Sequence, residues 1–411
     1  MLNMWEPNKP LPQIRPVEAF PINHEGQPMI GMRDPTGISP HVLIFAKPTL
    51  LILQTLDGKS TPRDVQALFM RQFKELIPLE KICEVVDNLD KHLFLESDHF
   101  RETYDKIVSD FKEAPVRKSR HSGSAYPGKR EELEEVIDQF FIDEAGPGKP
   151  EIPKNRSAVH GLAAPHIDYG RGWIGYAHAY KKLAEREVPD IFIILGTCHQ
   201  MMPTPYAMTK KKFETPLGEC EVDTAITEKI EKQTTYNVYK DEFFHRNEHS
   251  IEFQIVMLQH LYKKSPLIVP VLCGGFYGDQ VVGSSPMENP QIKSFITALE
   301  NTINESEKSV CVIASVDLAH IGAQFGDDYM VDENILKDLE KQDLAMLDLS
   351  IKGDCEGFWN NIVSDNNGRK ICGTAPLYTL TYLMKGKTGV LLHYDQAFSP
   401  ENTVSYASMI W

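Results

Sequence analysis

The chain has 411 residues, 42% of them hydrophobic and 25% charged, which excludes a largely disordered protein and leaves room for two domains. Its formal charge of −15 argues against nucleic acid or an anionic membrane as a partner, because both attract Lys and Arg. The chain shows no apolar run of the ~20 residues that cross a bilayer, no signal-peptide pattern and no CxxC pair among its seven cysteines, so we expect a cytoplasmic protein in a reducing compartment.

The first 100 residues predict an extended arm followed by a small helical domain. Residues 1–40 are rich in Pro and Gly and show no sustained period, which predicts the arm. Residues 47–58 predict a short buried helix, and Thr61 followed by Pro62 predicts the N-cap and first position of a second helix. A third helix is predicted from apolar residues at helical spacing, namely Ile82, Val85, Val86, Leu89 and Leu93.

Residues 41–100 therefore predict three helices that end in the apolar segment LFLE, the pattern of a winged helix-turn-helix. The segment LQTLDGKSTPRDVQ resembles PqqD-like domains, which implies a small, mainly helical, winged-helix-like domain. Its seven Lys or Arg against nine Asp or Glu disfavour a DNA-reading role. Peptide or partner binding, and a packing role without any ligand, both remain open.

Residues 101–118 are polar, end in a basic run and predict a linker to a second domain, residues 119–411. In this second domain apolar runs alternate with helical patterns, which predicts an α/β fold with a mostly parallel central sheet and helices on both faces. Ligands of such sheets gather where the strands end, at their carboxyl edge. The predicted strands are residues 158–164, 190–195, 267–272, 310–315, 389–392 and 404–410.

Histidines and a carboxylate follow three of these strands. His166, His199 and the pair Asp317 and His320 each come directly after a predicted strand. One histidine in such a place is more often structural, but several at the same edge predict a binding pocket. Imidazole, thiolate and carboxylate donors together suit Fe, Cu or Zn, and suit Mg or Ca poorly.

The residues alone do not decide which of the seven cysteines would supply the thiol of such a pocket. Cys372 precedes the helical run LYTLTYLMK, and a position near a helix N-terminus is expected to lower the pKa of the thiol toward the thiolate. Cys198, directly before His199, is the other candidate, and we rank it as a neighbour of the ligands rather than a ligand.

The segment from His245 to Glu252 formally matches H-x-x-E-H, a zinc signature whose two histidines share one helix. The residues before His245 are typical of a loop and the helical period starts near Glu248, so we treat the match as chance. His249 still lies within one turn of both glutamates, which makes it a candidate acid, base or substrate contact. Arg171, at a predicted helix start, is a candidate contact for an anionic group.

The second domain carries, in this order, the segments SGSAYPG, APHIDYG, LGTCHQ, FETPLGECEVD, EHSIEFQIVMLQHL, PVLCG, ASVDLAHIG, ICGTAPLY and LLHY. This series resembles the Memo family over roughly residues 119–411, and within it the branch called AmmeMemoRadiSam system protein B. The resemblance implies a fold similar to the LigB-type class III extradiol dioxygenases, whose non-haem iron uses two histidines and a carboxylate.

The resemblance also assigns roles to residues of this chain. The implied metal ligands are His166, His199 and Cys372, with Cys where the dioxygenases use a carboxylate. The residues implied to line the same pocket as catalytic groups that handle protons are His249, Asp317 and His320. The chain departs from the family at Ala125, where the family often shows Trp, and at the residues beside His166 and His199, which bears on substrate specificity rather than on the metal-facing positions.

Three hypotheses follow. The leading one is a Memo-like, metal-dependent oxidoreductase, similar to the dioxygenases, that uses Fe(II) or Cu, with Zn as a further option, on a small-molecule or peptide substrate. The alternative is a non-catalytic module that binds a peptide or works with a radical SAM protein and an AMMECR1-like protein, partners implied by the family context. The weaker third hypothesis is a zinc hydrolase that uses His245, Glu248 and His249.

Overall fold

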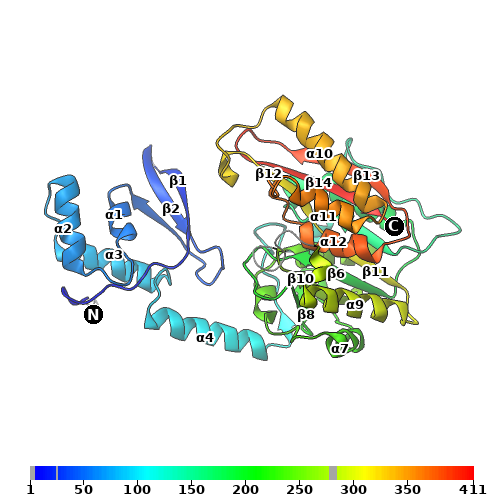
Figure 1. Ribbon diagram of the computed structural model, residues 1–411, viewed down its shortest axis with the longest axis horizontal. Coiled ribbons are helices and arrows are strands. Elements are labelled where there is room, and N and C mark those ends of the chain that lie inside the picture. Colours follow the sequence, from blue (N-terminus) through cyan, green and yellow to red (C-terminus); the bar gives the residue numbers. More distant parts are fainter. Residues whose placement is uncertain (1–4, 25, 277–284) are drawn as a thin grey trace. The chain divides into compact units, whose positions relative to one another are not determined.

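The computed structural model describes residues 5–24, 26–276 and 285–411. The chain divides into two compact units, Met1–Glu113 and Ala114–Trp411 (Figure 1). The division falls inside the segment 101–118 that we predicted as a linker, although its first part belongs to a helix of the first unit.

The first unit begins with a three-stranded antiparallel sheet of β1 (Glu18–His24), β2 (Gln27–Arg33) and β3 (Val42–Ala46), in that order. The predicted arm, residues 1–40, therefore contains a β-hairpin, which differs from our expectation. Gly26 in the turn has a φ of +79°, which glycine adopts without strain. Alternate residues of β3 are buried, so the sheet covers the helices with one face.

Four helices follow, as α1 (Thr49–Gln54), α2 (Pro62–Phe73), α3 (Leu79–Lys91) and α4 (Asp98–Glu113). The predicted start of the second helix is confirmed, because Thr61 caps α2 and Asp64 completes a reciprocal capping box with it. The segment after α3, which we expected to form a wing, makes only a single bridge, between Leu95 and Ile14.

The second unit contains an eight-stranded mixed sheet in the order β12-β14-β5-β11-β6-β10-β7, with β13 paired to β14. Its four central strands, β5, β11, β6 and β10, run parallel, and the outer strands on both sides pair antiparallel with their neighbours. The α/β class is thus confirmed, but the sheet is mixed where we expected a mostly parallel one. The strands are β5 (Gly161–Ala164), β6 (Ile191–Thr197), β7 (Tyr206–Met208), β10 (Leu267–Cys273), β11 (Val310–Ser315), β12 (Asp317–Ile321), β13 (Val390–Ala397) and β14 (Thr403–Ile410).

Helices cover both faces of this sheet, as predicted. Ile193 of β6 belongs to a hydrophobic core shared with α7, α9, α10, α11 and α12, whereas its neighbour Ile194 belongs to a second core shared with α5, α6 and α8. Successive residues of a strand point to opposite faces, so the two cores lie on opposite sides. The helices are α5 (Arg130–Ile142), α6 (Tyr169–Ala184), α7 (Thr224–Gln233), α8 (Ser250–Tyr262), α9 (Pro290–Asn304), α10 (Glu333–Ile351), α11 (Cys355–Val363) and α12 (Thr374–Leu383).

Shorter elements complete the second unit. The strands β4 (Val116–Arg117), β8 (Lys212–Thr215) and β9 (Gly218–Cys220) form a separate small sheet. A short 3-10 segment, η1 (Glu242–Arg246), precedes α8. In the part of the chain that the structure describes, no helix combines the length and the apolar character required for crossing a membrane.

Candidate metal centre

Three neighbouring parallel strands end together at the edge where the candidate residues lie. Ser315, the last residue of β11, pairs with Ala164 of β5 on one side and with Gly196 of β6 on the other. His166 follows the end of β5 and His199 follows the end of β6, so the two imidazoles start from the same level of the sheet. Their ring centroids are 4.9 Å apart and the rings are nearly perpendicular.

His166 is held in one ring orientation by a main-chain acceptor. The residue is only 1% exposed, and its Nδ1 lies 2.9 Å from the carbonyl oxygen of Ser315. Because a carbonyl can only accept, Nδ1 carries the proton and Nε2 keeps its lone pair. Burial lowers the pKa of His166 to about 4, so the ring is neutral near pH 7. A neutral imidazole with one nitrogen fixed in this way is the usual form of a histidine metal ligand.

His199 is oriented by the carboxylate of Glu248. Its Nδ1 lies 3.0 Å from Glu248 Oε1 and its backbone N–H donates to Glu248 Oε2 at 2.9 Å. Burial opposes charging of the ring, but the Glu248 carboxylate outweighs this and raises the pKa of His199 well above its ordinary value. The same contact occupies Nδ1, so Nε2 is the ring nitrogen through which His199 could bind a metal, after giving up its proton.

Glu248 is itself fully committed to donors. Its Oε1 accepts the backbone N–H groups of His249 and Ser250, at 2.8 and 3.1 Å, and lies 3.1 Å from the ring of His249. Burial alone would raise the pKa of Glu248, but the charges of His199 and His249 and their hydrogen bonds hold it well below its ordinary value. Glu248 therefore acts as an orienting carboxylate behind two histidines.

Cys372 approaches His166 from a segment that precedes α12. Its Sγ lies 3.3 Å from His166 Nε2 and 3.7 Å from the carbonyl oxygen of Asp317. The next residue, Gly373, passes so close to β12 that an added Cβ would lie 2.6 Å from the Asp317 oxygen, which explains the glycine. Burial raises the pKa of the Cys372 thiol, so our expectation of a lowered pKa is wrong for the metal-free protein.

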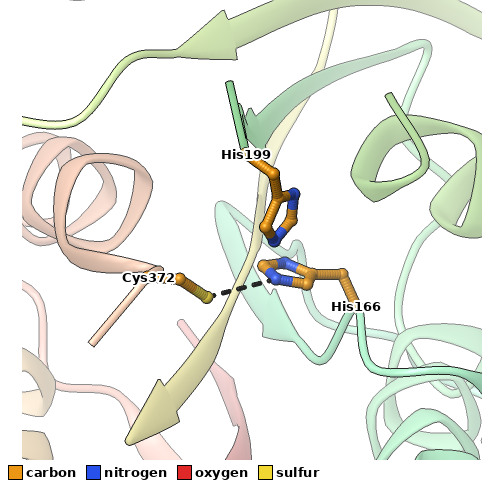
Figure 2. A group of neighbouring side chains, drawn as sticks. All are labelled: His166, His199 and Cys372. Atoms are coloured by element: carbon orange, nitrogen blue, oxygen red, sulfur yellow. Dashed lines mark hydrogen bonds between the residues drawn. The ribbon is translucent and has the colours of Figure 1, made fainter. Parts of the chain in front are cut away.

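The ligand atoms of His166, His199 and Cys372 lie within 4.8 Å of one another, although the residues come from three distant parts of the chain. Figure 2 shows the three side chains pointing toward one common space. A second group of donors, His199, Glu248 and His249, meets the same limit, but its carboxylate is occupied as described above.

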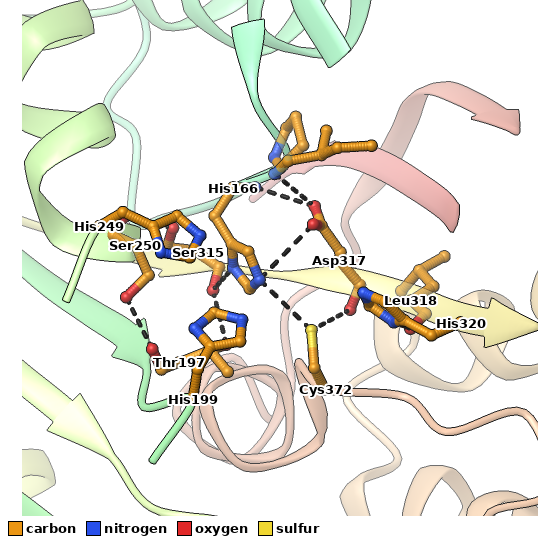
Figure 3. Close-up of polar contacts among 12 residues, drawn as sticks. His166, Thr197, His199, His249, Ser250, Ser315, Asp317, Leu318, His320 and Cys372 are labelled. Atoms are coloured by element: carbon orange, nitrogen blue, oxygen red, sulfur yellow. Dashed lines mark hydrogen bonds and ion pairs between the residues drawn. The ribbon is translucent and has the colours of Figure 1, made fainter. Parts of the chain in front are cut away.

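The three other predicted pocket residues lie close by, in different environments (Figure 3). The ring of His249 stacks on His199 at 4.7 Å and meets the edge of His166 at 5.5 Å, with its side chain 29% exposed. Asp317 accepts the backbone N–H of His166 at 2.9 Å, and its other oxygen lies 3.5 Å from His166 Nε2. His320 lies beside Asp317, with Nδ1 3.1 Å from the carbonyl oxygen of Leu318.

Three further residues that the sequence singled out lie apart from this group. His245 is buried in η1, and its Nε2 lies 3.0 Å from the carbonyl oxygen of Ala207. The H-x-x-E-H match therefore spans a 3-10 turn and a loop, as we predicted, and not one helix. Arg171 is paired with Asp168 at 2.6 Å. Cys198 Sγ donates to the carbonyl oxygen of Gln200 at 3.5 Å, and the sulfur does not belong to the group of ligand atoms.

Sequence reasoning missed the residues that orient the histidines. One feature of the sequence pointed to the orienting role of Glu248, namely its place directly before His249. Its contact with His199, however, depends on the fold. A second missed feature is the buried ion pair of Arg117 and Glu252, which fastens the start of the second unit to α8. The Arg117 guanidinium also donates to the carbonyl oxygens of His245 and Glu248, at 3.0 and 2.7 Å.

Comparisons with known proteins identify the family of the second unit. The family model described as "Memo-like protein" matches residues 117–410, which is nearly all of the second unit. A "MEMO1 family protein" of Aquifex aeolicus is 29% identical over 407 residues, covering 96% of this chain and 99% of the relative.

Archaeal relatives match a shorter part of this chain. A "MEMO1 family protein" of Sulfurisphaera tokodaii is 29% identical over 306 residues, which is 72% of this chain and 98% of the relative. Another of Desulfurococcus amylolyticus is 30% identical over 297 residues, 70% of this chain and 96% of the relative. With the matched family model spanning well over half of its length, the chain belongs to the Memo-like protein family.

Proposed function

We propose that the second unit binds a divalent first-row metal ion through His166, His199 and Cys372 and works as an oxidoreductase similar to the dioxygenases, with Fe(II) or Cu as the metal and Zn as a further option. The observation that carries this proposal is the convergence of three ligand atoms within 4.8 Å. Two imidazoles and one thiolate form a donor set suited to these metals.

The surroundings of the donors fit a metal site. The ring nitrogen of each histidine that faces away from Cys372 already has an acceptor, Ser315 O for His166 and Glu248 for His199. Such outer contacts fix the ring and raise the basicity of the remaining nitrogen. Three protein donors leave coordination positions for a substrate, and a metal bound there would supply Lewis-acid or redox chemistry.

The neighbouring groups are placed to position the ligands and to move protons. His249 is partly exposed and contacts both candidate histidine ligands, so it is the group best placed to exchange a proton between a bound substrate and solvent. Asp317 accepts the backbone N–H groups of His166 and Ile167, which fixes the backbone at the first candidate ligand. His320 lies beside Asp317 (Figure 3) and has the more indirect role.

Metal analysis of the full-length protein tests the proposal. Protein purified without oxygen and loaded separately with Fe(II), Cu and Zn should bind about one metal ion, and His166→Ala and Cys372→Ala should lose it. His245→Ala is the matched control, because His245 is a buried histidine outside the group. Wild-type metal content in both ligand variants would refute the assignment. Anomalous scattering at the iron, copper and zinc edges would then identify the metal and its ligands directly.

A second candidate function is the recruitment of a partner by the first unit. The Sulfurisphaera and Desulfurococcus relatives match 72% and 70% of this chain with nearly their whole length, so an additional unit is present here. The resemblance of residues 41–100 to PqqD-like domains, and of the second unit to the AmmeMemoRadiSam branch, favours a radical SAM protein as that partner. Co-purification with such a protein should be lost when residues 1–113 are removed, and unchanged retention would contradict it.

A further inference from the structure

A buried carboxylate outside the candidate metal centre lies behind the segment that carries Cys372. Asp343, in α10, is fully buried, and its Oδ1 lies 3.1 Å from Nη1 of Arg369, which is 6% exposed. The same guanidinium donates to Asn361 Oδ1 at 2.7 Å and to Asp365 Oδ2 at 3.2 Å. Arg369 is therefore fixed by three side chains, three residues before Cys372.

The other oxygen of Asp343 is linked through Ser405 of β14 to β12, the strand that carries Asp317. Its Oδ2 accepts from Ser405 Oγ at 2.6 Å and from Tyr394 OH at 3.1 Å. Ser405 Oγ in turn accepts the backbone N–H of Ala319, in β12, at 3.0 Å. The Asp343 carboxylate thus contacts both Arg369, in the segment before Cys372, and Ser405, which binds the backbone of β12.

The main chains of these two segments are also joined. The N–H of His320 donates to the carbonyl oxygen of Arg369 at 2.8 Å, and the N–H of Gly373 donates to that of Asp317 at 3.2 Å. The segment before Cys372 has an unusual backbone, which persists only where its surroundings hold it. The residues with positive φ in this segment are Asn366, Asn367 and Lys370.

Stability alone does not account for an ion pair in this place. Removing two charges from water costs about as much as their attraction returns, and apolar pairs of the same size often do equally well. An apolar pair, however, could not bind the Ser405 hydroxyl, the Tyr394 hydroxyl and the Arg369 guanidinium at once. The pair therefore supplies geometry, which a metal centre built from distant segments requires.

We propose that Asp343 and Arg369 are positioning residues, whose ion pair holds the Cys372 segment against β12 and so sets the place of the Cys372 sulfur relative to His166. The inference rests on the proposed metal site, which gives that placement its purpose. The side-chain contacts of Asp343 and Arg369 described above go to residues other than the three candidate ligands. Their effect on the ligands therefore passes through the backbone.

Two variants of the full-length protein test the inference. Asp343→Asn keeps the size of the side chain but removes its charge, and Ser405→Ala removes the hydroxyl that links the Asp343 carboxylate to the backbone of Ala319. Asp34→Asn is the matched control, because Asp34 forms a comparable buried pair with Arg15, at 3.0 Å, in the first unit. Two measurements are made: the affinity for Co(II) with its thiolate-to-metal absorption band, and the rate at which iodoacetamide alkylates Cys372 in metal-free protein, followed by peptide mass spectrometry.

Both variants should bind Co(II) about tenfold more weakly, with a shifted thiolate band, as expected for the loss of an outer contact. Alkylation of Cys372 should become about tenfold faster, since the loosened segment exposes the sulfur. The control should match wild type in both measurements. Wild-type affinity, band and alkylation rate in the two variants would overturn the inference.

A failure of the proposed metal site can be distinguished from a failure of this inference. If wild-type protein shows no thiolate-to-Co(II) band, the metal assignment of Cys372 fails, while the alkylation rates still decide whether the ion pair positions the segment. If Asp343→Asn does not fold, Ser405→Ala decides, because it retains the ion pair and removes only the two hydrogen bonds of one hydroxyl.

Discussion

Replacing His166 by Gln removes a buried histidine that resists protonation. Burial lowers the pKa of His166 in the folded protein to about 4, against an ordinary value of 6.5. As the pH falls below 6.5 the unfolded chain takes up a proton at this residue, whereas the folded protein does so only near pH 4. The folded state therefore loses stability across this interval, and at ~1.4 kcal/mol per pH unit the loss amounts to about 3 kcal/mol.

Urea unfolding of chelator-treated, metal-free protein measures this loss. Tryptophan fluorescence follows mainly the second unit, since Trp173, Trp359 and Trp411 lie there. Between about pH 7 and pH 4 the wild type should lose about 3 kcal/mol more unfolding free energy than His166→Gln. The raised pKa of His199 acts in the opposite direction, because its stabilisation is complete below 6.5 and is lost at higher pH, and this contribution is common to both proteins.

Equal losses in the two proteins would refute the reasoning, since they would mean that His166 titrates alike in the folded and unfolded states. His245 serves as a check on the principle, because burial lowers its pKa to about 3. His245→Gln should reduce the acid loss in the same direction, without any effect on the candidate metal centre.

Three further predictions follow from contacts described above. Glu248→Gln should weaken metal binding by about 10- to 100-fold in a Co(II) titration, because His199 loses the carboxylate that orients its ring. Gly373→Ala should destabilise the second unit by about 1–3 kcal/mol in urea unfolding, since its Cβ would lie 2.6 Å from the Asp317 carbonyl oxygen. Thr61→Ala should lower the unfolding free energy of the first unit by about 1 kcal/mol, because it removes the cap of α2, and should leave metal binding unchanged.

Each of these predictions has an outcome that contradicts it. Undiminished Co(II) affinity in Glu248→Gln would show that the carboxylate does not orient a ligand. A Gly373→Ala protein as stable as wild type would show that the segment before α12 shifts freely. Loss of metal in Thr61→Ala would show that the first unit takes part in the centre.

The place of the histidines could be predicted because parallel strands end at a common edge. The runs before His166 and His199 are mainly apolar, as buried parallel strands require, and both match observed strands of the central sheet. The register of neighbouring strands then brings the residues that follow them together. This local signal was enough to place two imidazoles in one pocket.

Features that depend on distant partners could not be predicted in the same way. The apolar run at residues 404–410 correctly predicted a strand. Only the fold shows that this strand, β14, lies antiparallel between β12 and β5. The choice of Cys372 among seven thiols came from the resemblance, since its contact with His166 joins residues 206 positions apart. The hairpin in residues 18–33 was missed because strands that pair only within a small sheet leave a weak periodic signal.

The carbonyl oxygen of Ser315 has a consequence for how mutation can change the candidate centre of this chain. It accepts from Nδ1 of His166 at 2.9 Å and from the hydroxyl of Thr197 at 3.0 Å, and both bonds use the main chain. No amino-acid replacement at position 315 deletes that acceptor, so alanine scanning would overlook it. The tautomer of His166 is therefore fixed by the β11 backbone, which no side-chain substitution removes. The orientation of His199, in contrast, depends on the Glu248 side chain, which a single nucleotide change can replace.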